Sequence, residues 1–405
     1  MKKKLQKLRA EPWLLIAIPF SFITLALIIA LRPIIRIRIG FLRSERIGHF
    51  AANTEIYLCE RDVNKGDRTT IDLVYFTRKV CNQQLATMWS RRLLVLPWFW
   101  LRPLDLIIRS FAILSCYHAF EGKGGDRDIN NLLDKIPSHL QFTNDEEKRG
   151  KAGLSAMGVK GDARFVCMTV RDSAYLSDLY HGADTHYHNY RDSDIQNYVS
   201  AVEALANRGY YVIRMGAKVS ATLNSSNPKV IDYAANGMRT DFMDIYLGAK
   251  CEFCISTSTG FDAIPLIFRR PIVYVNMVPL GWVFTFSSKF LAITKHHFSV
   301  SKNRELTLRE IFEDEVGFCM DTNGYESGGV QLIQNSPEEI CSVVLEMADR
   351  VEGIWQPHAE DETLQKRFWR IFPSDAKDTR NVSLHGEIRS HFGTEFLRRN
   401  EGWLM

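Results

Sequence analysis

The segment CEFCISTSTGFDAIPLIFRRPIVYVN, residues 251–276, is the most informative stretch of this 405-residue chain. An apolar run at residues 253–255 enters a loop of hydroxyl residues and glycine; a short apolar helix and a second strand at residues 272–275 follow. Such a loop, at the carboxyl end of a parallel strand, presents backbone N–H groups and hydroxyls to an anion, usually a phosphate. The segment therefore predicts a nucleotide or nucleotide-sugar ligand. The alternative is that Ser and Thr only cap the helix.

The residues before this segment repeat the same alternation of strand and helix. Strands are predicted at residues 165–170, 209–214 and 230–233, and helices at residues 193–207 and 241–247. This βαβαβ order is typical of a doubly wound parallel sheet. We therefore expect a Rossmann-like domain over residues 159–384.

The first half of the chain has a similar pattern. Strands are predicted at residues 33–40, 71–76 and 93–96, with a helix at residues 49–58 after the first of them. These elements predict a Rossmann-like domain over residues 33–158, which ends in a helix capped by Thr143 and Glu146. The expected fold is therefore α/β, with two tandem Rossmann-like doubly wound domains. The last segment, residues 385–405, is expected to form a helix that packs back on the first domain.

In the predicted domain over residues 159–384, three strands are followed by groups that can bind an anion. Because parallel strands of one sheet end at the same edge, we expect these groups to gather there. Arginine, hydroxyl and backbone N–H groups can hold a diphosphate without a metal. For each arginine the alternative is an ion pair, such as Arg171 with Asp172. The predicted donor-binding residues are Arg171, Arg214, Gly216, Ser256, Ser258, Thr259 and Gly260.

The matching edge of the first domain carries the sequence RIGHF, residues 46–50. Gly48 permits a turn that other residues resist, and His49 begins a helix that should face the interdomain cleft. A histidine titrates near neutral pH, so it can take a proton from a sugar hydroxyl or stabilise a leaving phosphate. We therefore predict His49 as the catalytic residue, with Arg46, Gly48 and Asn53 as substrate neighbours; a structural role for His49 is the alternative.

The chain begins with an apolar segment between two basic clusters. Residues 13–31 contain no charged residue, which is long enough to reach across a bilayer core of about 30 Å at about 1.5 Å per residue. Residues 1–32 are therefore expected to form a membrane anchor. Both flanks are basic, so the sequence leaves open whether the segment spans the bilayer or lies in the plane of the cytoplasmic leaflet. The globular part is expected to be cytoplasmic, at the bacterial inner membrane.

Composition argues against several classes of protein. The net charge is only +4, so the whole chain is not built to bind nucleic acid. Eight cysteines are scattered, and Cys251 and Cys254 have no second pair to complete a zinc site. A metal role for His181, His186 and His188 is a minor alternative, because their spacing is not that of a helical zinc motif. We expect neither a metal nor a cofactor.

Several longer motifs resemble one family. The segments RIGHFAANTEIYLCERD, VCMTVRDSAYL, HNYRDSDIQNYVSAVEAL with GYYVIRMG, TDFMDIYLGAKCEFCISTSTGFDAIPLIFRRPIVYVN and GTEFLRRNEGWL are similar to bacterial glycosyltransferases from surface-polysaccharide gene clusters. The likeness covers about residues 36–404. More distantly, the STSTG unit resembles the donor-phosphate loop of heptosyltransferases, and RIGH takes the place of their first-domain glycine loop. The sequence departs from heptosyltransferases at Thr257-Ser258 and at His49, where they commonly have an aspartate.

The resemblance implies a GT-B-like glycosyltransferase, metal-independent and hexosyltransferase-like, with the acceptor on the first domain and the nucleotide-sugar donor on the second. We expect it to build a surface glycan, such as O-antigen, capsule or exopolysaccharide, on a lipid-linked acceptor at the membrane. Two alternatives stay open: a nucleotide-sugar epimerase of the same two-domain shape, and a non-catalytic subunit of polysaccharide assembly.

Overall fold

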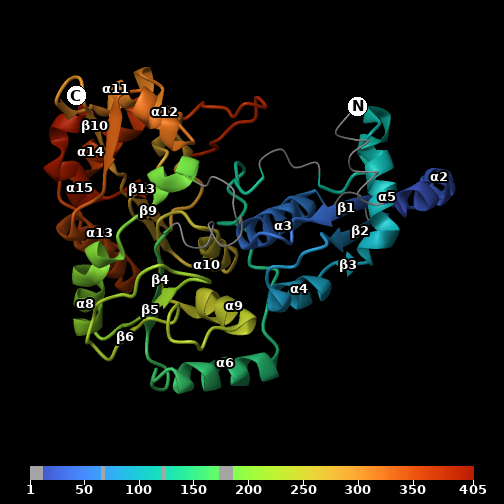
Figure 1. Cartoon of the computed structure of the whole chain (residues 1–405), viewed down its shortest axis with the longest axis horizontal. Coiled ribbons are helices and arrows are strands. Elements are labelled where there is room, and N and C mark those ends of the chain that lie inside the picture. The colour runs from blue at the N-terminus through green and yellow to red at the C-terminus, as the bar shows by residue number, and fades with distance from the viewer. Residues whose placement is uncertain (1–11, 65–68, 121–124, 173–185) are drawn as a thin grey trace. The chain divides into compact units, whose positions relative to one another are not determined.

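The computed structural model describes residues 12–64, 69–120, 125–172 and 186–405 (Figure 1). The chain divides into two compact units. Unit 1 contains the residues up to 125 together with residues 139–141, and unit 2 contains residues 126–138 and 142–405. Because residues 139–141 return to unit 1, the polypeptide crosses between the units three times.

Unit 1 is built on a small parallel sheet. Its three strands lie in the order β1-β2-β3, and the alternating isoleucines of β1 place Ile39 in the core. Helices follow each strand, as expected for parallel connections. The strands are β1 (Arg36–Leu42), β2 (Thr70–Phe76) and β3 (Leu94–Val95), and the helices are α2 (Leu14–Leu31), α3 (Ile47–Val63), α4 (Gln83–Ser90), α5 (Trp98–Ile108) and the 3-10 turn η1 (Ala112–Tyr117).

The first helix, α2, belongs to unit 1 instead of standing apart from it. Leu25 and Ile28 of α2 join the same apolar cluster as Leu101 and Leu104 of α5. At the start of α2, the ring of Trp13 meets that of Trp98 edge to face at 5.3 Å. In the described part of the chain, no helix combines the length and the apolar character needed to cross a membrane.

Unit 2 contains a seven-stranded parallel sheet in the order β13-β9-β8-β7-β4-β5-β6. The strands are short, and the central strands β4, β5, β7 and β8 are fully buried, which is typical of parallel sheets covered on both faces. The parallel α/β architecture that the sequence predicts is therefore confirmed. The strands are β4 (Phe165–Thr169), β5 (Tyr211–Met215), β6 (Val230–Ile231), β7 (Cys254–Ser256), β8 (Ile272–Tyr274), β9 (Phe290–Ala292) and β13 (His391–Phe392).

Helices and a second sheet surround this core. The second sheet is antiparallel, in the order β11-β10-β12, and the sequence analysis did not predict it. The helices are α6 (Asn144–Ala156), α8 (Val199–Asn207), α9 (Asp241–Lys250), α10 (Ala263–Ile267), α11 (Leu308–Glu313), α12 (Thr322–Ser327), α13 (Pro337–Glu352), α14 (Asp361–Ile371) and α15 (Thr394–Arg399), and the strands are β10 (His296–Ser299), β11 (Arg304–Glu305) and β12 (Val330–Ile333).

The end of the chain differs from the prediction. The expected helix is shorter, because residues 391–392 form strand β13 before α15 begins. In α15, Thr394 hydrogen-bonds to Glu346 of α13 at 2.8 Å, and Arg398 forms an ion pair with Asp361 of α14 at 2.7 Å. These contacts place the C-terminal segment in unit 2 and not on the first domain.

Helix α6 also lies in unit 2, whereas the predicted boundary at residue 158 assigned it to the first domain. Glu147 of α6 forms an ion pair with Lys250 of α9 at 2.6 Å. A Cβ atom added at Gly150 would lie 2.1 Å from the ring of Tyr246. The absence of a side chain at this glycine therefore lets α6 and α9 approach closely, and this contact moves the boundary toward residue 125.

Candidate functional site

The candidate site lies at the point where the strand order of the large sheet reverses. From β4 the chain builds β5 and β6 on one side, and then returns to build β7, β8, β9 and β13 on the other. At such a switch point the two neighbouring crossovers leave in opposite directions and open a crevice at the carboxyl ends of the strands. The crevice lies between β4, which is followed by Arg171, and β7, which is followed by the STSTG loop.

Hydrogen bonds hold the two strand ends together. Thr257 Oγ1 accepts a hydrogen bond from the backbone N–H of Arg171 at 2.8 Å, and the hydroxyls of Thr169 and Thr259 are 3.0 Å apart. Ser258 stands at the tip of the loop with a φ of 58°, a left-handed conformation that costs energy for a residue other than glycine. Conformations of this kind gather at ligand sites, where the surrounding structure holds them in place.

Asp262 lies beneath the loop and organises it. Its carboxylate accepts a hydrogen bond from Ser256 Oγ at 2.7 Å, and Ser256 Oγ in turn lies 3.4 Å from the backbone N–H of Thr259. Burial raises the pKa of Asp262 to about 7, although the bond from Ser256 opposes this rise. The loop therefore rests on a carboxyl group that changes its charge near neutral pH.

Two arginines face the crevice from neighbouring segments. Arg191, the last residue of η2 (His186–Arg191), donates a hydrogen bond to the carbonyl of Ser258. Burial lowers the pKa of Arg171 to about 10, and the positive charge of Arg191 lowers it in the same direction. Within the described residues, the Nε atoms of Arg171 and Arg191 are buried and have no hydrogen-bond partner. Arg171 Nε lies 3.5 Å from a carboxylate oxygen of Asp192, which neutralises part of its charge. Two close guanidinium groups with buried Nε atoms that lack a hydrogen bond can still bind an anion.

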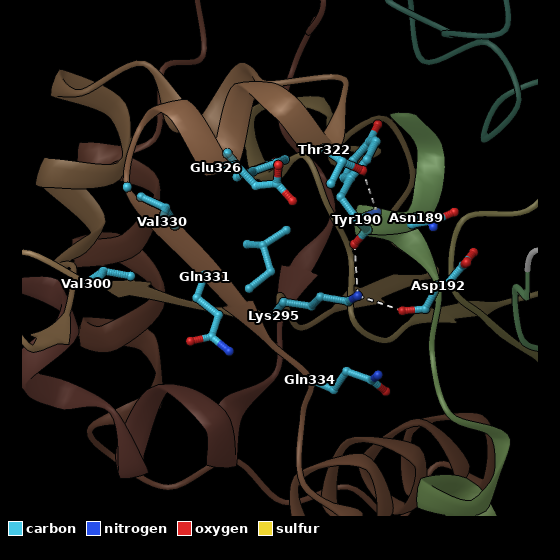
Figure 2. Close-up of a pocket in the computed structure, with 13 residues that line it drawn as sticks. Asn189, Tyr190, Asp192, Lys295, Val300, Thr322, Glu326, Val330, Gln331 and Gln334 are labelled. Atoms are coloured by element: carbon cyan, nitrogen blue, oxygen red, sulfur yellow. Dashed lines mark hydrogen bonds between the residues drawn. The ribbon is translucent and has the colours of Figure 1, made fainter. Parts of the chain in front are cut away.

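A cavity of about 620 Å³ opens on the other side of the segment that carries Arg191 (Figure 2). The ammonium group of Lys295, just after β9, donates to the carbonyls of Tyr190 at 2.9 Å and Asp192 at 2.7 Å. Burial lowers the pKa of Lys295 to about 8. Lys295 therefore fixes residues 190–192, which form a wall of the cavity and also present Arg191 to the crevice.

The cavity has a mixed lining, in which polar groups that suit a hydroxyl-bearing ligand lie beside Val300, Val330 and Leu332. Figure 2 shows Glu326 and Thr322 on one side, and Gln331 and Gln334 on the other. The hydroxyl of Tyr325, which also lines the cavity, is buried without a hydrogen-bond partner in the described part of the chain. Amide, carboxylate and hydroxyl groups around a cavity of this size are typical of a site for a small polar molecule.

The structure separates the predicted donor residues into two groups. Arg171, Ser258 and Thr259 come together at the crevice, and Gly260 is exposed at the first position of the short turn η4 (Gly260–Asp262). The hydroxyl of Ser256 points inward to Asp262 instead of toward a ligand.

Arg214 and Gly216 have structural surroundings. The Arg214 side chain is buried, and its Nη1 donates to the carbonyl of Ala221 at 2.6 Å and to Asp232 at 3.0 Å. A Cβ atom added at Gly216 would lie 2.8 Å from a methyl group of Val219. Local packing thus accounts for both residues, because the arginine satisfies an internal carboxylate and the glycine leaves room for a neighbour.

Unit 1 presents its own group of residues at the carboxyl edge of its sheet. Arg46 is the N-cap of α3, Gly48 follows in the first turn, and His49 Nδ1 lies 3.4 Å from Asn53 Oδ1 one turn later. The loop after β1 is joined to the loop after β2, because Ser44 Oγ donates to the carbonyl of Lys79 at 2.8 Å. The described side chains of Arg43, Arg46, Arg78 and Lys79 are all exposed at this edge, with Glu45 beside them.

One cluster in unit 1 has ligand atoms spaced as in a metal site. Glu55, Cys59 and His139 bring such atoms within 4.8 Å of one another. The ring of His139 contacts Glu55 at 3.1 Å and Asp62 at 3.3 Å. Burial lowers the pKa of His139, but these two carboxylates outweigh burial and the net shift is upward. This geometry favours a protonated histidine that ties residues 139–141 to α3. Of the three loop histidines considered as metal ligands, His181 lies outside the described residues.

Sequence reasoning missed Arg191, Asp262 and the cavity residues. Arg191 lies in the HNYRD segment, where the sequence predicts no binding residue, and it approaches the STSTG loop only in the folded chain. Asp262 follows the loop directly, so its position beneath the hydroxyls could have been suggested by the sequence STSTGFD. The cavity depends on residues from η2, α12 and β12, which are far apart in sequence.

Comparison with known proteins gives distant structural similarity only. No family model matches the chain, and no curated protein matches it. The structure resembles the E. coli ADP-heptose LPS heptosyltransferase II, with 14% identity, a TM-score of 0.37, and coverage of 64% of this chain and 90% of that one.

Two further solved structures are similar at the same level. A glycosyl transferase of family 9 from Veillonella parvula has 10% identity and a TM-score of 0.36, over 60% of this chain and 80% of its own. A Listeria monocytogenes protein described as a UDP-N-acetylglucosamine 2-epimerase by inference has 8% identity and a TM-score of 0.29, over 80% of this chain and 98% of its own. Because all three TM-scores are below 0.5, these likenesses do not identify the activity of this chain.

Proposed function

We propose that this protein is a glycosyltransferase that moves a sugar from a nucleotide-sugar donor to a lipid-linked or growing surface-polysaccharide acceptor. The observation that carries the proposal is the pair Arg171 and Arg191 at the switch point of the large sheet, whose buried Nε atoms have no hydrogen-bond partner among the described residues. Two guanidinium groups beside a hydroxyl loop match the charge and the oxygens of a diphosphate. The sequence motifs that resemble glycosyltransferases of surface-polysaccharide clusters favour a sugar as the group attached to it.

The cavity beside the crevice supports the same proposal. Its volume of about 620 Å³ suits a sugar or ribose, and its amide and carboxylate groups can accept and donate hydrogen bonds to hydroxyls. Asp192 lines the cavity, and its carboxylate also lies 3.5 Å from Arg171 Nε. A donor with its diphosphate at Arg171 and Arg191 could therefore place a hydroxyl-bearing part in the cavity.

The proposed reaction needs no metal or cofactor. The bond between the anomeric carbon and the phosphate oxygen breaks, and the oxygen of an acceptor hydroxyl bonds to that carbon. The nucleoside diphosphate leaves with the bonding electron pair, and Arg171 and Arg191 stabilise its negative charge. His49 takes the proton of the acceptor hydroxyl. We place the reaction at the cytoplasmic face of the bacterial inner membrane, where nucleotide sugars are available.

The first experiment is calorimetric titration of UDP, GDP, ADP and CMP, and of their sugars, into the full-length protein and into Arg171→Ala and Arg191→Ala. A hydrogen bond to a charged group contributes about 1.5 to 3 kcal/mol, so each variant should bind the preferred nucleotide roughly ten- to a hundredfold more weakly. Arg304→Ala is the matched control, because this arginine is exposed and paired with Glu310 at 2.8 Å in another part of unit 2.

Equal affinity in the folded wild type and both crevice variants would place the donor elsewhere. Binding of a nucleotide sugar followed by isomerisation without any acceptor would favour the epimerase. Failure of every nucleotide to bind would favour a non-catalytic assembly subunit.

A further inference from the structure

The outer face of α2 is a second feature that the donor site does not explain. Ile16, Phe20, Ile23 and Leu27 follow one another at helical spacing, and the last three are 66%, 62% and 60% exposed. The opposite face carries Leu14, Ser21, Leu25 and Ile28, all buried. The helix is thus apolar on two sides, and only one of them is covered by the described part of unit 1.

Residues distant in sequence extend this apolar face. At the start of α5, Phe99 and Trp100 are exposed, the latter by 63%, and at the start of η1 Phe111 and Ile113 are exposed, the latter by 86%. Contacts at both ends hold α2 in place: Trp13 meets Trp98 of α5 at one end, and Arg32 lies 5.9 Å from the ring centroid of Tyr117 in η1 at the other. Figure 1 shows α2 on the outer side of α5.

Polar groups on the face are already satisfied within the helix. The hydroxyl of Thr24, on the exposed side, donates to the carbonyl of Phe20 at 3.2 Å. On the buried side, the hydroxyl of Ser21 likewise donates to the carbonyl of Ala17 at 2.9 Å. A hydroxyl bonded to its own helix backbone can enter hydrocarbon without an unpaired donor. The face therefore lacks the polar groups that would favour water or a hydrogen-bonding protein partner.

The charged residues of the segments around the face are mostly basic, although Arg38 is paired with Asp72 at 2.7 Å and Arg109 with Asp105 at 3.7 Å. Residues 12–44 and 91–120, which contain α2, α5 and η1, hold a single acidic residue, Asp105, and it is buried. The same two segments hold eight arginines, namely Arg32, Arg36, Arg38, Arg43, Arg91, Arg92, Arg102 and Arg109. A second copy of this chain would bring arginines against arginines, whereas anionic lipid headgroups would neutralise them. Exposed tryptophan and phenylalanine beside such a face are typical of a membrane interface.

We propose that α2, the start of α5 and η1 form one membrane-binding surface that enters a single leaflet of an anionic bilayer, with α2 lying in the plane of the membrane. The in-plane orientation follows from the packing of α2 on α5, because α2 cannot cross the bilayer along its axis unless α5 enters the bilayer with it. An in-plane helix sinks only about 5 to 10 Å into the headgroup and acyl boundary. The carboxyl edge of the unit 1 sheet, with Arg43, Arg46 and Arg78, would then lie close to the membrane. This last point rests on the proposed function, because that edge is the proposed acceptor site.

The test is co-sedimentation of the full-length protein with vesicles of phosphatidylglycerol and phosphatidylcholine, compared with phosphatidylcholine alone. Anionic vesicles should bind more than about tenfold better, since each arginine near the surface contributes about 1 kcal/mol. The triple variant Phe20→Ser, Ile23→Ser, Leu27→Ser, and separately Trp100→Ser, should lower the partition coefficient, the triple variant by about tenfold or more. Ile354→Ser, an exposed isoleucine of unit 2, is the control and should bind as the wild type does.

Orientation needs a second measurement. A tag placed before Met1 should be cut by protease added on the side of the membrane that holds the folded units; a protected tag would overturn the in-plane orientation. Vesicle binding that is equal in the wild type and the triple variant, or absent in the wild type, would overturn the surface itself. The proposed membrane surface would also be overturned if the wild type formed a dimer without lipid and the triple variant did not. None of these readouts uses a nucleotide, so failure here is distinguishable from failure of the proposed function.

Discussion

Asp262 controls the charge beneath the STSTG loop. Burial raises the pKa of its carboxyl group from 3.8 to about 7, so the folded protein keeps this proton to a higher pH than the unfolded chain does. The carboxyl group therefore stabilises the fold less as pH rises from about 4 to 7. Above pH 7 the same group carries a negative charge a short distance from the proposed diphosphate site.

We expect nucleotide diphosphate affinity to fall between pH 6 and pH 8 in the wild type, and to fall less in Asp262→Asn, because an amide keeps the loop contact without gaining charge. Calorimetric titration at pH 6, 7 and 8 measures both. The nucleotide itself titrates in this range, so the comparison between the two proteins, and not the wild-type slope, is decisive. Parallel slopes would show that Asp262 does not titrate near the ligand.

His49 is the proposed base of the transfer reaction. His49→Ala should lower turnover by roughly 10² to 10⁴-fold, the usual contribution of a positioned acid or base, and should leave nucleotide affinity nearly unchanged. His358→Ala is a control, because His358 is exposed in unit 2. Release of nucleoside diphosphate in the presence of membranes with acceptor measures the rate. A wild-type rate in His49→Ala would show that His49 is not the base and only contacts Asn53.

At the scale of elements, glycines decide how closely helices approach. Gly150 and Gly153 of α6 lie one turn apart and face α9, where added Cβ atoms would come within 2.1 Å of Tyr246 and 2.4 Å of Met243. This contact places α6 in unit 2. A helix pattern in the sequence indicates that α6 exists, but it does not indicate the surface on which the helix packs.

Gly150→Ala should therefore destabilise unit 2. The added methyl group meets an aromatic ring, so overpacking of about 1 to 3 kcal/mol should exceed the gain in helix propensity of about 1 kcal/mol. Urea unfolding followed by circular dichroism measures the difference. Lys151→Ala, at an exposed position of the same helix, should change stability little. If Gly150→Ala were as stable as the wild type, α6 would not pack on α9 in this way.

At the scale of the whole molecule, His296 connects three elements of unit 2. From β10 its ring contacts Glu305 of β11 at 3.1 Å and Glu339 of α13 at 3.0 Å. Burial lowers the pKa of His296, but the hydrogen bonds to the two glutamates outweigh burial and raise the pKa to about 9. The antiparallel sheet is thus fastened to α13 by a charged histidine.

This arrangement predicts how stability depends on pH. A histidine with a raised pKa contributes fully below its ordinary value of 6.5, and the contribution is lost as pH rises through about 9. The free energy of unfolding of the wild type should therefore decrease between pH 6.5 and pH 9, by an amount on the order of 3 kcal/mol. His296→Gln should be less stable at pH 6.5 and show a flatter profile. A parallel decline in both proteins would assign the effect to other groups.

The sequence by itself determined the α/β class, most strands, and the position of the phosphate-type loop, because these depend on local periodicity, on turn residues and on the hydroxyl and glycine content of one segment. It also placed His49 next to Asn53, since residues one turn apart on a helix are neighbours in any fold. The strand order could not be predicted in this way, because adjacency in a sheet depends on which hydrophobic faces are buried together.

Only the tertiary structure decided which predicted residues share a site. Arg171 follows β4 and faces the crevice, whereas Arg214 lies inside β5 and pairs with Asp232 within unit 2. Arg191 reached the site from a loop that had no predicted role. The same holds for α2: its composition indicated an apolar helix, and its packing on α5 decided which face stays exposed. The physical reason is that charge pairing and burial act between residues that are distant along the chain, so their outcome depends on the whole packing.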